Sequence, residues 1–276
     1  MDLLLVIVYV CLLKLKLGLN GSFVWKNTMD QAINYKSDWW SALGAAKKLI
    51  ADPKDTPQVF VIMQALNGKS NKSGYNRLLT TKNGGQLAYR QVELASQLSE
   101  PQNLANLSVG SVGHNYRNMM KATGYSANGL AAASNIEGER IYAEHPHAWY
   151  ARRTRDIHDI WHVLTGYSPD EPLDEACLVA FSYAQTKGLG WALIALFKII
   201  DCRKLAFGRM QIRAIVEAYK NGKKATWLPA ENYLALLEEP LEQARVRLNI
   251  QQPTDYLKYR SQVPIKAELF ADTSWA

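Results

Sequence analysis

Two histidines and an aspartate lie close together in the segment His158-Asp159-Ile160-Trp161-His162. On a helix, His158 and His162 are one turn apart and share a face. Asp159 borders the same face because it precedes His162 by three residues. Two imidazole nitrogens and one carboxylate oxygen can therefore converge on one point above the helix. This donor set is typical of a divalent metal site, as in the paired histidines of zinc-protease helices.

A structural role for these side chains is the alternative, because a single histidine on a helix is more often structural than a ligand. The motif has apolar neighbours at Ile157, Ile160, Trp161, Val163 and Leu164. They place the polar face in surroundings where an acid without a partner is costly. The pairing of two histidines with an acid in such surroundings favours a metal site.

A further ligand has to come from another element. Pro169 and Pro172 predict a loop over 167–173, after which Asp174 and Glu175 enter the first turn of the next helix. An acid in that position is favoured by the positive end of the helix dipole. Spacing alone leaves both Asp174 and Glu175 open as the fourth ligand.

The surrounding sequence predicts helices that position this motif. One helix is expected over 150–165, closed by Gly166, and a long helix over 174–200, weakened at Gly188 and Gly190. Other helices are expected over 39–50, 58–66, 85–98, 114–123, 210–220, 230–238 and 240–248, with loops over 67–73 and 143–149. No convincing run of alternating strands is present. The predicted fold is an all-α, single-domain multi-helix bundle with the metal site on a central helix.

Composition and charge support a folded domain and exclude some classes of function. Of 276 residues, 48% are hydrophobic and 21% charged, which suits a substantial core and argues against disorder. The net charge of +7 is scattered in small groups, without a nucleic-acid-binding signature, so no nucleic-acid partner is expected. Such a surface also suits an anionic membrane face. The three widely spaced cysteines, Cys11, Cys177 and Cys202, indicate a reducing compartment.

The N-terminal segment opens with an apolar run over 3–13. It is shorter than the about 20 residues that a membrane-spanning helix needs. Asp2 argues against a secretion signal, and the lack of arginine before Arg77 argues against a mitochondrial transit peptide. The run is expected either as a buried helix or as a helix at a membrane surface. We expect a cytoplasmic, bacterial protein that is peripheral on the inner membrane.

Several segments resemble one known family. The motif HDIWHVLTGY at 158–167 resembles the HDxxH…E metal motif of the Coq-four-type proteins of coenzyme Q (ubiquinone) biosynthesis. The segment 110–116 resembles the family's G-(T/S)-x-G-x-x-Y pattern, and 51–53 before an apolar helix fits as well. The segments 233–241 and 244–248 resemble its closing pattern. The resemblance spans about 40–250, so we expect an N-terminal apolar helix and connector (1–36), a Coq-four-like domain (37–250) and a C-terminal tail (251–276).

The resemblance implies a metal held by His158, Asp159, His162 and an acid twelve positions after the second histidine. That position holds Asp174, but the sequence from Glu175 onward matches the family better. We therefore infer a one-residue insertion in the loop, with Glu175 as the ligand and Asp174 as the helix cap. Zinc is the expected metal, although mixed histidine and carboxylate ligands also accept magnesium, manganese or iron.

The resemblance further implies action on a polyprenylated 4-hydroxybenzoate-type precursor, in which a hydroxyl replaces the carboxylate on ring carbon 1. Arg155 is expected to bind the substrate carboxylate, or else to form a salt bridge with Asp159 or Glu175. Tyr167 and Tyr116 are expected as hydrogen-bond donors, or else as ordinary core residues. The apolar run 188–197 is expected to line a slot for the prenyl tail, or else to serve helix packing.

Three functions from different classes are open. The chain is either an enzyme of this decarboxylation or a lipid-binding scaffold with a structural metal that organises the other ubiquinone-biosynthesis proteins. An unrelated metal-dependent hydrolase is the third hypothesis and the weakest, because it would need more histidine ligands than His114, His145 and His147 offer. Expected partners are the prenylated precursor, other proteins of the pathway and a membrane surface, and a homodimer is left open.

Overall fold

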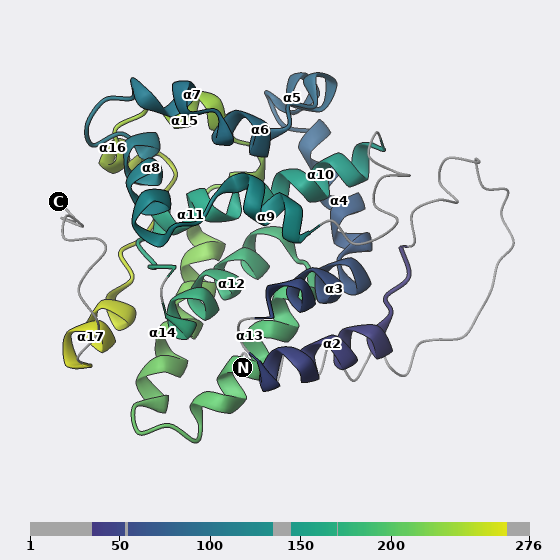
Figure 1. Cartoon of the computed structure of the whole chain (residues 1–276), viewed down its shortest axis with the longest axis vertical. Coiled ribbons are helices and arrows are strands. Elements are labelled where there is room, and N and C mark those ends of the chain that lie inside the picture. Colours follow the sequence, from purple (N-terminus) through teal and green to yellow (C-terminus); the bar gives the residue numbers. More distant parts are fainter. Residues whose placement is uncertain (1–34, 53–54, 135–144, 170, 264–276) are drawn as a thin grey trace, which may run out of the picture.

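The computed structural model describes residues 35–52, 55–134, 145–169 and 171–263, and this part of the chain is built from helices (Figure 1). The predicted all-α fold is confirmed. In chain order the elements are α2 (Trp39–Ala51), α3 (Thr56–Leu66), α4 (Gly68–Leu79), α5 (Gly84–Arg90), α6 (Leu94–Ser99), α7 (Pro101–Ala105), α8 (Val112–Thr123), α9 (Ala127–Ala133), α10 (Pro146–Asp156), α11 (His158–Thr165), α12 (Pro172–Thr186), α13 (Leu189–Cys202), α14 (Gly208–Lys224), η2 (Leu228–Ala230), α15 (Tyr233–Leu236), α16 (Leu241–Arg247) and α17 (Thr254–Gln262). The predicted N-terminal apolar helix lies outside the described residues.

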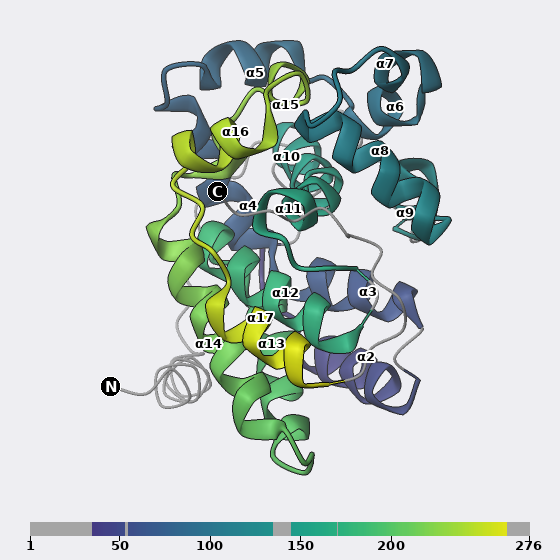
Figure 2. The same cartoon turned by 90° about the vertical axis from the view of Figure 1, so that its left-hand side faces the viewer.

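Helix α11 lies in the middle of the molecule. In both views it separates a group of short helices, which includes α5 to α8, α15 and α16, from the longer helices α12, α13 and α14 (Figures 1 and 2). Every residue of α11 except Asp159 is buried. A helix that is surrounded in this way holds its side chains in fixed positions, which is what a metal site requires.

Helix α12 packs closely along α14. A side chain on Gly222 would place its Cβ 2.8 Å from both the carbonyl oxygen of Phe181 and the Cβ of Ala184. The absence of a side chain at Gly222 therefore sets the distance between the two helices. Since α12 also carries Glu175, this packing positions the predicted fourth ligand.

Gly222→Ala is expected to lower the free energy of unfolding by about 1–3 kcal/mol, because α12 or α14 must shift to admit the methyl group. Gly44→Ala is the matched control, since nothing lies within 4 Å of the position where its Cβ would be. That substitution should raise stability by about 0.5–1 kcal/mol through helix propensity. Urea unfolding measures both values. Equal stability of the Gly222→Ala variant and the wild type would contradict the close packing.

Several predicted boundaries were wrong. The helix expected over 150–165 is two helices, α10 and α11, which meet at Ile157, where the backbone adopts φ −78° and ψ −12°. The loop expected over 143–149 is helical from Pro146 onward. The long helix over 174–200 breaks at Lys187, which adopts the left-handed φ of 58°, while Gly190 stays helical.

Tertiary packing overrode local sequence preferences elsewhere. The polar loop expected over 67–73 belongs to α4, whose Gly74 lies against the Tyr150 ring of α10. The helix expected over 85–98 is divided into α5 and α6 at Gln91, where φ is 43°. Helix α14 continues through Asn221 and Gly222 rather than stopping there. The expected C-terminal tail contains α17, which packs against α14.

None of the helices in the described part of the chain combines the length and the apolar character needed to cross a bilayer.

Candidate metal centre

The buried face of α11 fixes the helix in the core. Ile160, Trp161 and Leu164 are at most 1% exposed. The indole nitrogen of Trp161 donates a hydrogen bond to the Tyr233 hydroxyl at 2.6 Å. Gly166, with φ 77°, ends the helix and donates its backbone N–H to the His162 carbonyl at 2.9 Å. The histidines are therefore held on a helix with little freedom to rotate.

A buried arginine secures the carboxyl end of the same helix. Arg245 of α16 donates through Nε to the Leu164 carbonyl at 3.0 Å and through Nη2 to the Val163 carbonyl at 3.1 Å. A cation at this end also opposes the negative end of the helix dipole. No local pattern predicts this role for Arg245, although the residue lies in the segment 244–248 that resembles the family's closing pattern.

The expected ligands lie together. His158, Asp159 and His162 each offer a ligand atom, and these atoms lie within 4.8 Å of one another. Glu175 of α12 adds its carboxylate, with Oε1 3.0 Å from His158 Nε2 and Oε2 3.2 Å from His162 Nε2. The carboxylate of Glu175 therefore faces both imidazoles from α12, beside the cluster formed by His158, Asp159 and His162. Tetrahedral zinc sites are built from such donors.

The orientation of His162 is set by its other ring nitrogen. Nδ1 lies 2.8 Å from the backbone carbonyl of Tyr167 and donates its proton to that oxygen. This contact fixes the tautomer, so that Nε2 is the nitrogen that faces Glu175. Histidines that bind metals commonly donate their second N–H to a carbonyl or carboxylate in this manner. The loop after Gly166 thus orients a ligand through its backbone.

The charges of the cluster suit a divalent cation. Burial raises the pKa of Asp159 above its usual value, against the attraction of His158 and His162. Burial lowers the pKa of His158, but the charge of Glu175 and its hydrogen bond outweigh this and leave the pKa raised. The same contacts hold the pKa of Glu175 below its usual value, although burial acts in the opposite direction. Both shifts favour a protonated His158 beside an ionised Glu175, and a divalent cation can replace that proton.

His158 is enclosed on its remaining side. The Trp191 ring of α13 stacks on its imidazole, with centroids 5.2 Å apart and planes 10° apart. The Nδ1 atom of His158 is buried and has no hydrogen-bond partner among the described residues. The cluster is open on the side of Glu175, whose side chain is 47% exposed. Trp191 was missed as part of the site because it lies about thirty residues further along the chain in a uniformly apolar run.

Asp174 lies in a different environment from its neighbour Glu175. It is fully buried, and its Oδ2 accepts a hydrogen bond from Arg260 Nη1 of α17 at 3.2 Å. Burial raises the pKa of Asp174 to about 7, against the lowering effects of Arg260 and Tyr256. The N-cap of α12 is Glu171, so the prediction that Asp174 caps this helix was wrong. Asp174 links α12 to α17.

Of the two residues expected to be catalytic, Tyr167 contacts the cluster through its backbone, whereas Arg155 has other partners. Arg155 donates through Nε to Asp156 at 2.8 Å and through Nη1 to Ser134, and it forms no ion pair with Asp159 or Glu175 in the described part of the chain. Tyr167 is buried, with its ring against Tyr256, and its hydroxyl interacts with Asn221. Burial raises the pKa of Tyr167 well above its usual value. Tyr167 contacts the proposed metal ligand His162 through its backbone carbonyl.

Tyr116 of α8 is a tyrosine whose pKa is raised in part by the charge of Asp159 in the cluster. It is buried, and burial together with the charges of Asp159 and Asp156 raises its pKa. The hydroxyl therefore stays protonated and keeps its hydrogen-bond donor near Asp159.

Tyr167→Phe is expected to leave metal affinity within about threefold of the wild type, because the carbonyl that orients His162 is retained. Stability should fall by about 1 kcal/mol through loss of the buried hydroxyl contact. Titration against a chromophoric chelator measures the affinity, and urea unfolding measures the stability. A loss of affinity of more than about tenfold would show that the hydroxyl itself supports the site.

The apolar run 188–197 mostly serves helix packing. A Cβ on Gly190 would lie 2.7 Å from the sulfur of Met63 and 3.1 Å from Asn67 Oδ1. The Asn67 side chain also accepts the Gly190 N–H at 2.9 Å. A Cβ on Gly188 would likewise lie 2.8 Å from Asn67 Oδ1, so both glycines allow α13 to approach the end of α3. A role of the run in binding a prenyl tail stays a prediction.

Comparison with known proteins gives a consistent result. The family model described as "Coenzyme Q (ubiquinone) biosynthesis protein Coq4" matches residues 31–254. The mitochondrial ubiquinone biosynthesis protein COQ4 homolog of Rattus norvegicus is 24% identical over 218 residues, which cover 79% of each chain. The mitochondrial ubiquinone biosynthesis protein COQ4 of Yarrowia lipolytica is 28% identical over 183 residues, which cover 65% of this chain and 66% of the relative.

A solved structure shares the fold. The crystal structure of a candidate ubiquinone biosynthesis protein from Nostoc punctiforme superimposes with a TM-score of 0.59 and 21% sequence identity. It matches 79% of this chain and 100% of the solved chain. At this level of identity the likeness supports the helical fold alone.

Proposed function

Because the chain belongs to the Coq4 family of coenzyme Q (ubiquinone) biosynthesis proteins, we propose that it acts directly on a polyprenylated 4-hydroxybenzoate-type precursor of ubiquinone. A role in ubiquinone biosynthesis follows from the family. The proposed step is an oxidative decarboxylation, in which a hydroxyl replaces the carboxylate on ring carbon 1. The observation that supports this proposal is the cluster of His158, Asp159 and His162, with the half-exposed Glu175 carboxylate within 3.2 Å of both imidazoles.

These four residues would hold one divalent cation, with zinc as the first candidate. When bound, such an ion acts as a Lewis acid that stabilises negative charge developing on an oxygen. The chain contributes the fixed positions of the donors. His162 is oriented by the Tyr167 carbonyl, and His158 is held against the Trp191 ring.

Arg155 is our candidate for binding the substrate carboxylate. Its Nε and Nη1 are engaged by Asp156 and Ser134, whereas no described residue hydrogen bonds with Nη2. A guanidinium that is already held in place by two contacts loses little conformational freedom when it binds a carboxylate. By binding the carboxylate, Arg155 would orient the aromatic ring of the substrate relative to the cluster. Tyr116 would contribute its protonated hydroxyl as a donor.

The proposed step is a two-electron oxidation. The bond between C1 and the carboxylate breaks, the carboxylate leaves as carbon dioxide, and a bond between C1 and oxygen forms. With dioxygen as the oxidant and water as the source of the hydroxyl oxygen, one hydrogen peroxide forms for each carbon dioxide. The reaction therefore requires air.

The test uses purified, metal-loaded protein and a prenylated 4-hydroxybenzoate labelled with ¹³C in its carboxylate. We expect labelled carbon dioxide to be released under air but not under argon, and to be lost in the His162→Ala variant. Release at an equal rate under argon, or from the variant, would contradict the proposed reaction.

A lipid-binding scaffold with a structural metal is the second candidate function. The observation that favours it is a pair of open surface pockets in the described part of the chain, which are lined by residues of α14 with the α13–α14 turn or α17. Tight binding of a prenyl lipid without turnover in the same assay would support the scaffold over the enzyme. The partners would then be other ubiquinone-biosynthesis proteins.

The place of action is also a proposal. The named relatives are mitochondrial, and the scattered basic residues of this chain favour peripheral contact with an anionic membrane surface. A prenylated substrate resides in a bilayer, so membrane contact would bring the protein to it.

A further inference from the structure

The turn between α13 and α14 combines exposed apolar and basic side chains at one end of the molecule. Ile200, Leu205 and Phe207 are 41%, 48% and 44% exposed. Arg203, Lys204 and Arg209 are exposed between and beside them. We name these six residues the basic-apolar tip. Large apolar side chains that gather at one exposed turn are a sign of an interaction surface.

We propose that the basic-apolar tip is a membrane-docking surface that inserts its apolar side chains among the headgroups of an anionic bilayer. Figures 1 and 2 show that the turn between α13 and α14 projects from the lower end of the molecule, well separated from α11. The surface is therefore distinct from the metal centre. It requires no assumption about the reaction at that centre.

The charge of this region is one-sided. Between Lys198 and Arg213 the chain has five basic residues and a single acid, Asp201. Basic residues beside a bilayer are attracted by anionic headgroups, and the attraction falls off within a Debye length. Charge complementarity therefore selects an anionic lipid surface.

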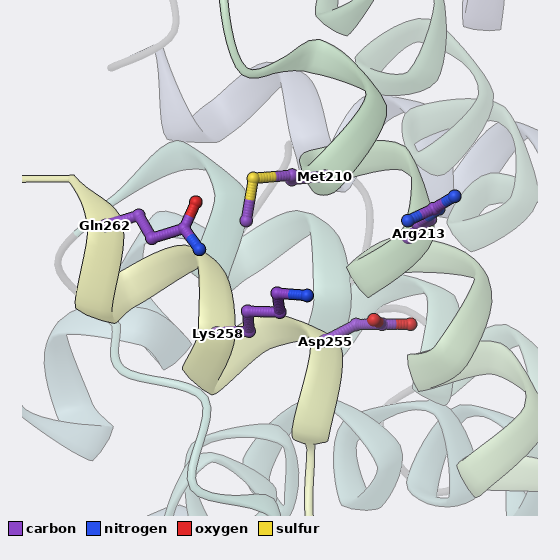
Figure 3. Close-up of a pocket in the computed structure, with 5 residues that line it drawn as sticks. All are labelled: Met210, Arg213, Asp255, Lys258 and Gln262. Atoms are coloured by element: carbon purple, nitrogen blue, oxygen red, sulfur yellow. The ribbon is translucent and has the colours of Figure 1, made fainter.

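A pocket extends the basic surface from the tip toward α17. It has a volume of about 260 Å³ and is lined by Met210, Arg213, Asp255, Lys258 and Gln262. Figure 3 shows that Met210 and Arg213 come from α14, whereas the other three come from α17. Arg213 and Lys258 supply two cations against the one carboxylate of Asp255. These cations add to the positive charge beside the tip, which attracts headgroup phosphates.

Other occupants fit this surface less well. A second copy of the chain docked tip to tip would bring two sets of like charges together, which is unfavourable. An acidic protein would satisfy the cations. However, exposed apolar residues at a projecting turn, flanked by lysine and arginine, are the arrangement found at membrane interfaces.

The test is co-sedimentation of the full chain with phospholipid vesicles. One set of vesicles contains phosphatidylcholine alone, and the other contains phosphatidylcholine mixed with phosphatidylglycerol. We expect the wild type to bind the anionic vesicles at least about tenfold more tightly than the neutral ones, with an affinity that falls as salt is added.

Two variants test the two components of the tip. Leu205→Ser/Phe207→Ser removes the apolar contact, and Arg203→Glu/Arg209→Glu reverses the charge. Each should bind anionic vesicles at least about tenfold more weakly. Lys82→Glu/Lys121→Glu is the matched control, because it alters net charge equally at exposed residues of the opposite group of helices. It should bind within about threefold of the wild type.

The proposal is overturned if the wild type does not bind anionic vesicles, or if both tip variants bind as the wild type does. It is also overturned if the control loses as much affinity as the charge-reversed tip, since the effect would then come from net charge alone. Metal content of the tip variants should remain that of the wild type. Failure of vesicle binding is thus separable from failure of the metal centre.

Discussion

His158→Ala and His162→Ala are each expected to reduce bound metal from one ion per chain to near zero. Each removes an imidazole that no nearby side chain can replace, and the remaining donors cannot complete a four-ligand site. Metal content after loading and dialysis, measured by inductively coupled plasma mass spectrometry, gives the stoichiometry directly.

Helicity should survive these substitutions. The opposite face of α11 is held by Ile160, Trp161 and Leu164, and the end of the helix is secured by Arg245. Far-UV circular dichroism should therefore remain close to that of the wild type. His114→Ala is the control, because His114 lies on α8 outside the cluster, and that variant should keep one ion. Full stoichiometry in both cluster variants would contradict the assignment of the site.

Glu175→Gln is expected to weaken metal binding by at least about 100-fold, whereas Asp174→Asn should change it by less than about threefold. Glutamine keeps the size of the side chain but loses the negative charge that faces both imidazoles. Asp174 contacts Arg260 and lies one residue away on α12, so Asp174→Asn is a control for the same carboxylate-to-amide change at the start of the same helix. Competition with a chromophoric chelator measures both affinities.

The opposite pattern would reassign the fourth ligand. If Asp174→Asn lost the metal and Glu175→Gln retained it, the inferred loop insertion would be wrong. Asp174 would then have to leave Arg260 when the metal binds. A loss in both variants would point to a general disturbance at the start of α12.

The sequence was most informative where local geometry decides the structure. The spacing of His158 and His162 predicts a shared helical face, and Gly166 predicts the end of that helix, because both depend on residues within one or two turns. The resemblance of the following segment then identified Glu175 as the acid to examine. The structure places its carboxylate beside both imidazoles.

Contacts between distant residues could not be predicted in this way. Arg245 secures α11 from 81 residues away, and Trp191 reaches His158 from another helix. The break between α10 and α11 falls where the sequence has neither glycine nor proline, so no local signal marks it. Helix α4 similarly packs against α10 through the close approach of Gly74 to the Tyr150 ring, which no local pattern predicts.

The environment of Arg155 also depended on the fold. The alternatives considered from the sequence were the substrate carboxylate, Asp159 and Glu175, all near the metal motif. In the structure the neighbouring Asp156 takes the ion pair, and Asp156 also accepts the backbone N–H of Ala95 at 3.1 Å. The resulting contacts connect α10 to α6, and one guanidinium nitrogen remains for a ligand.

The most direct test of the account is the dependence of turnover on metal occupancy. The protein is stripped with a chelator and reloaded in steps, and the release of carbon dioxide from the prenylated 4-hydroxybenzoate is measured under air at each occupancy. The account predicts no release from the stripped protein and a rate that rises in proportion to bound metal until one ion per chain is reached. An undiminished rate from the stripped protein, or no release at any occupancy, would contradict it.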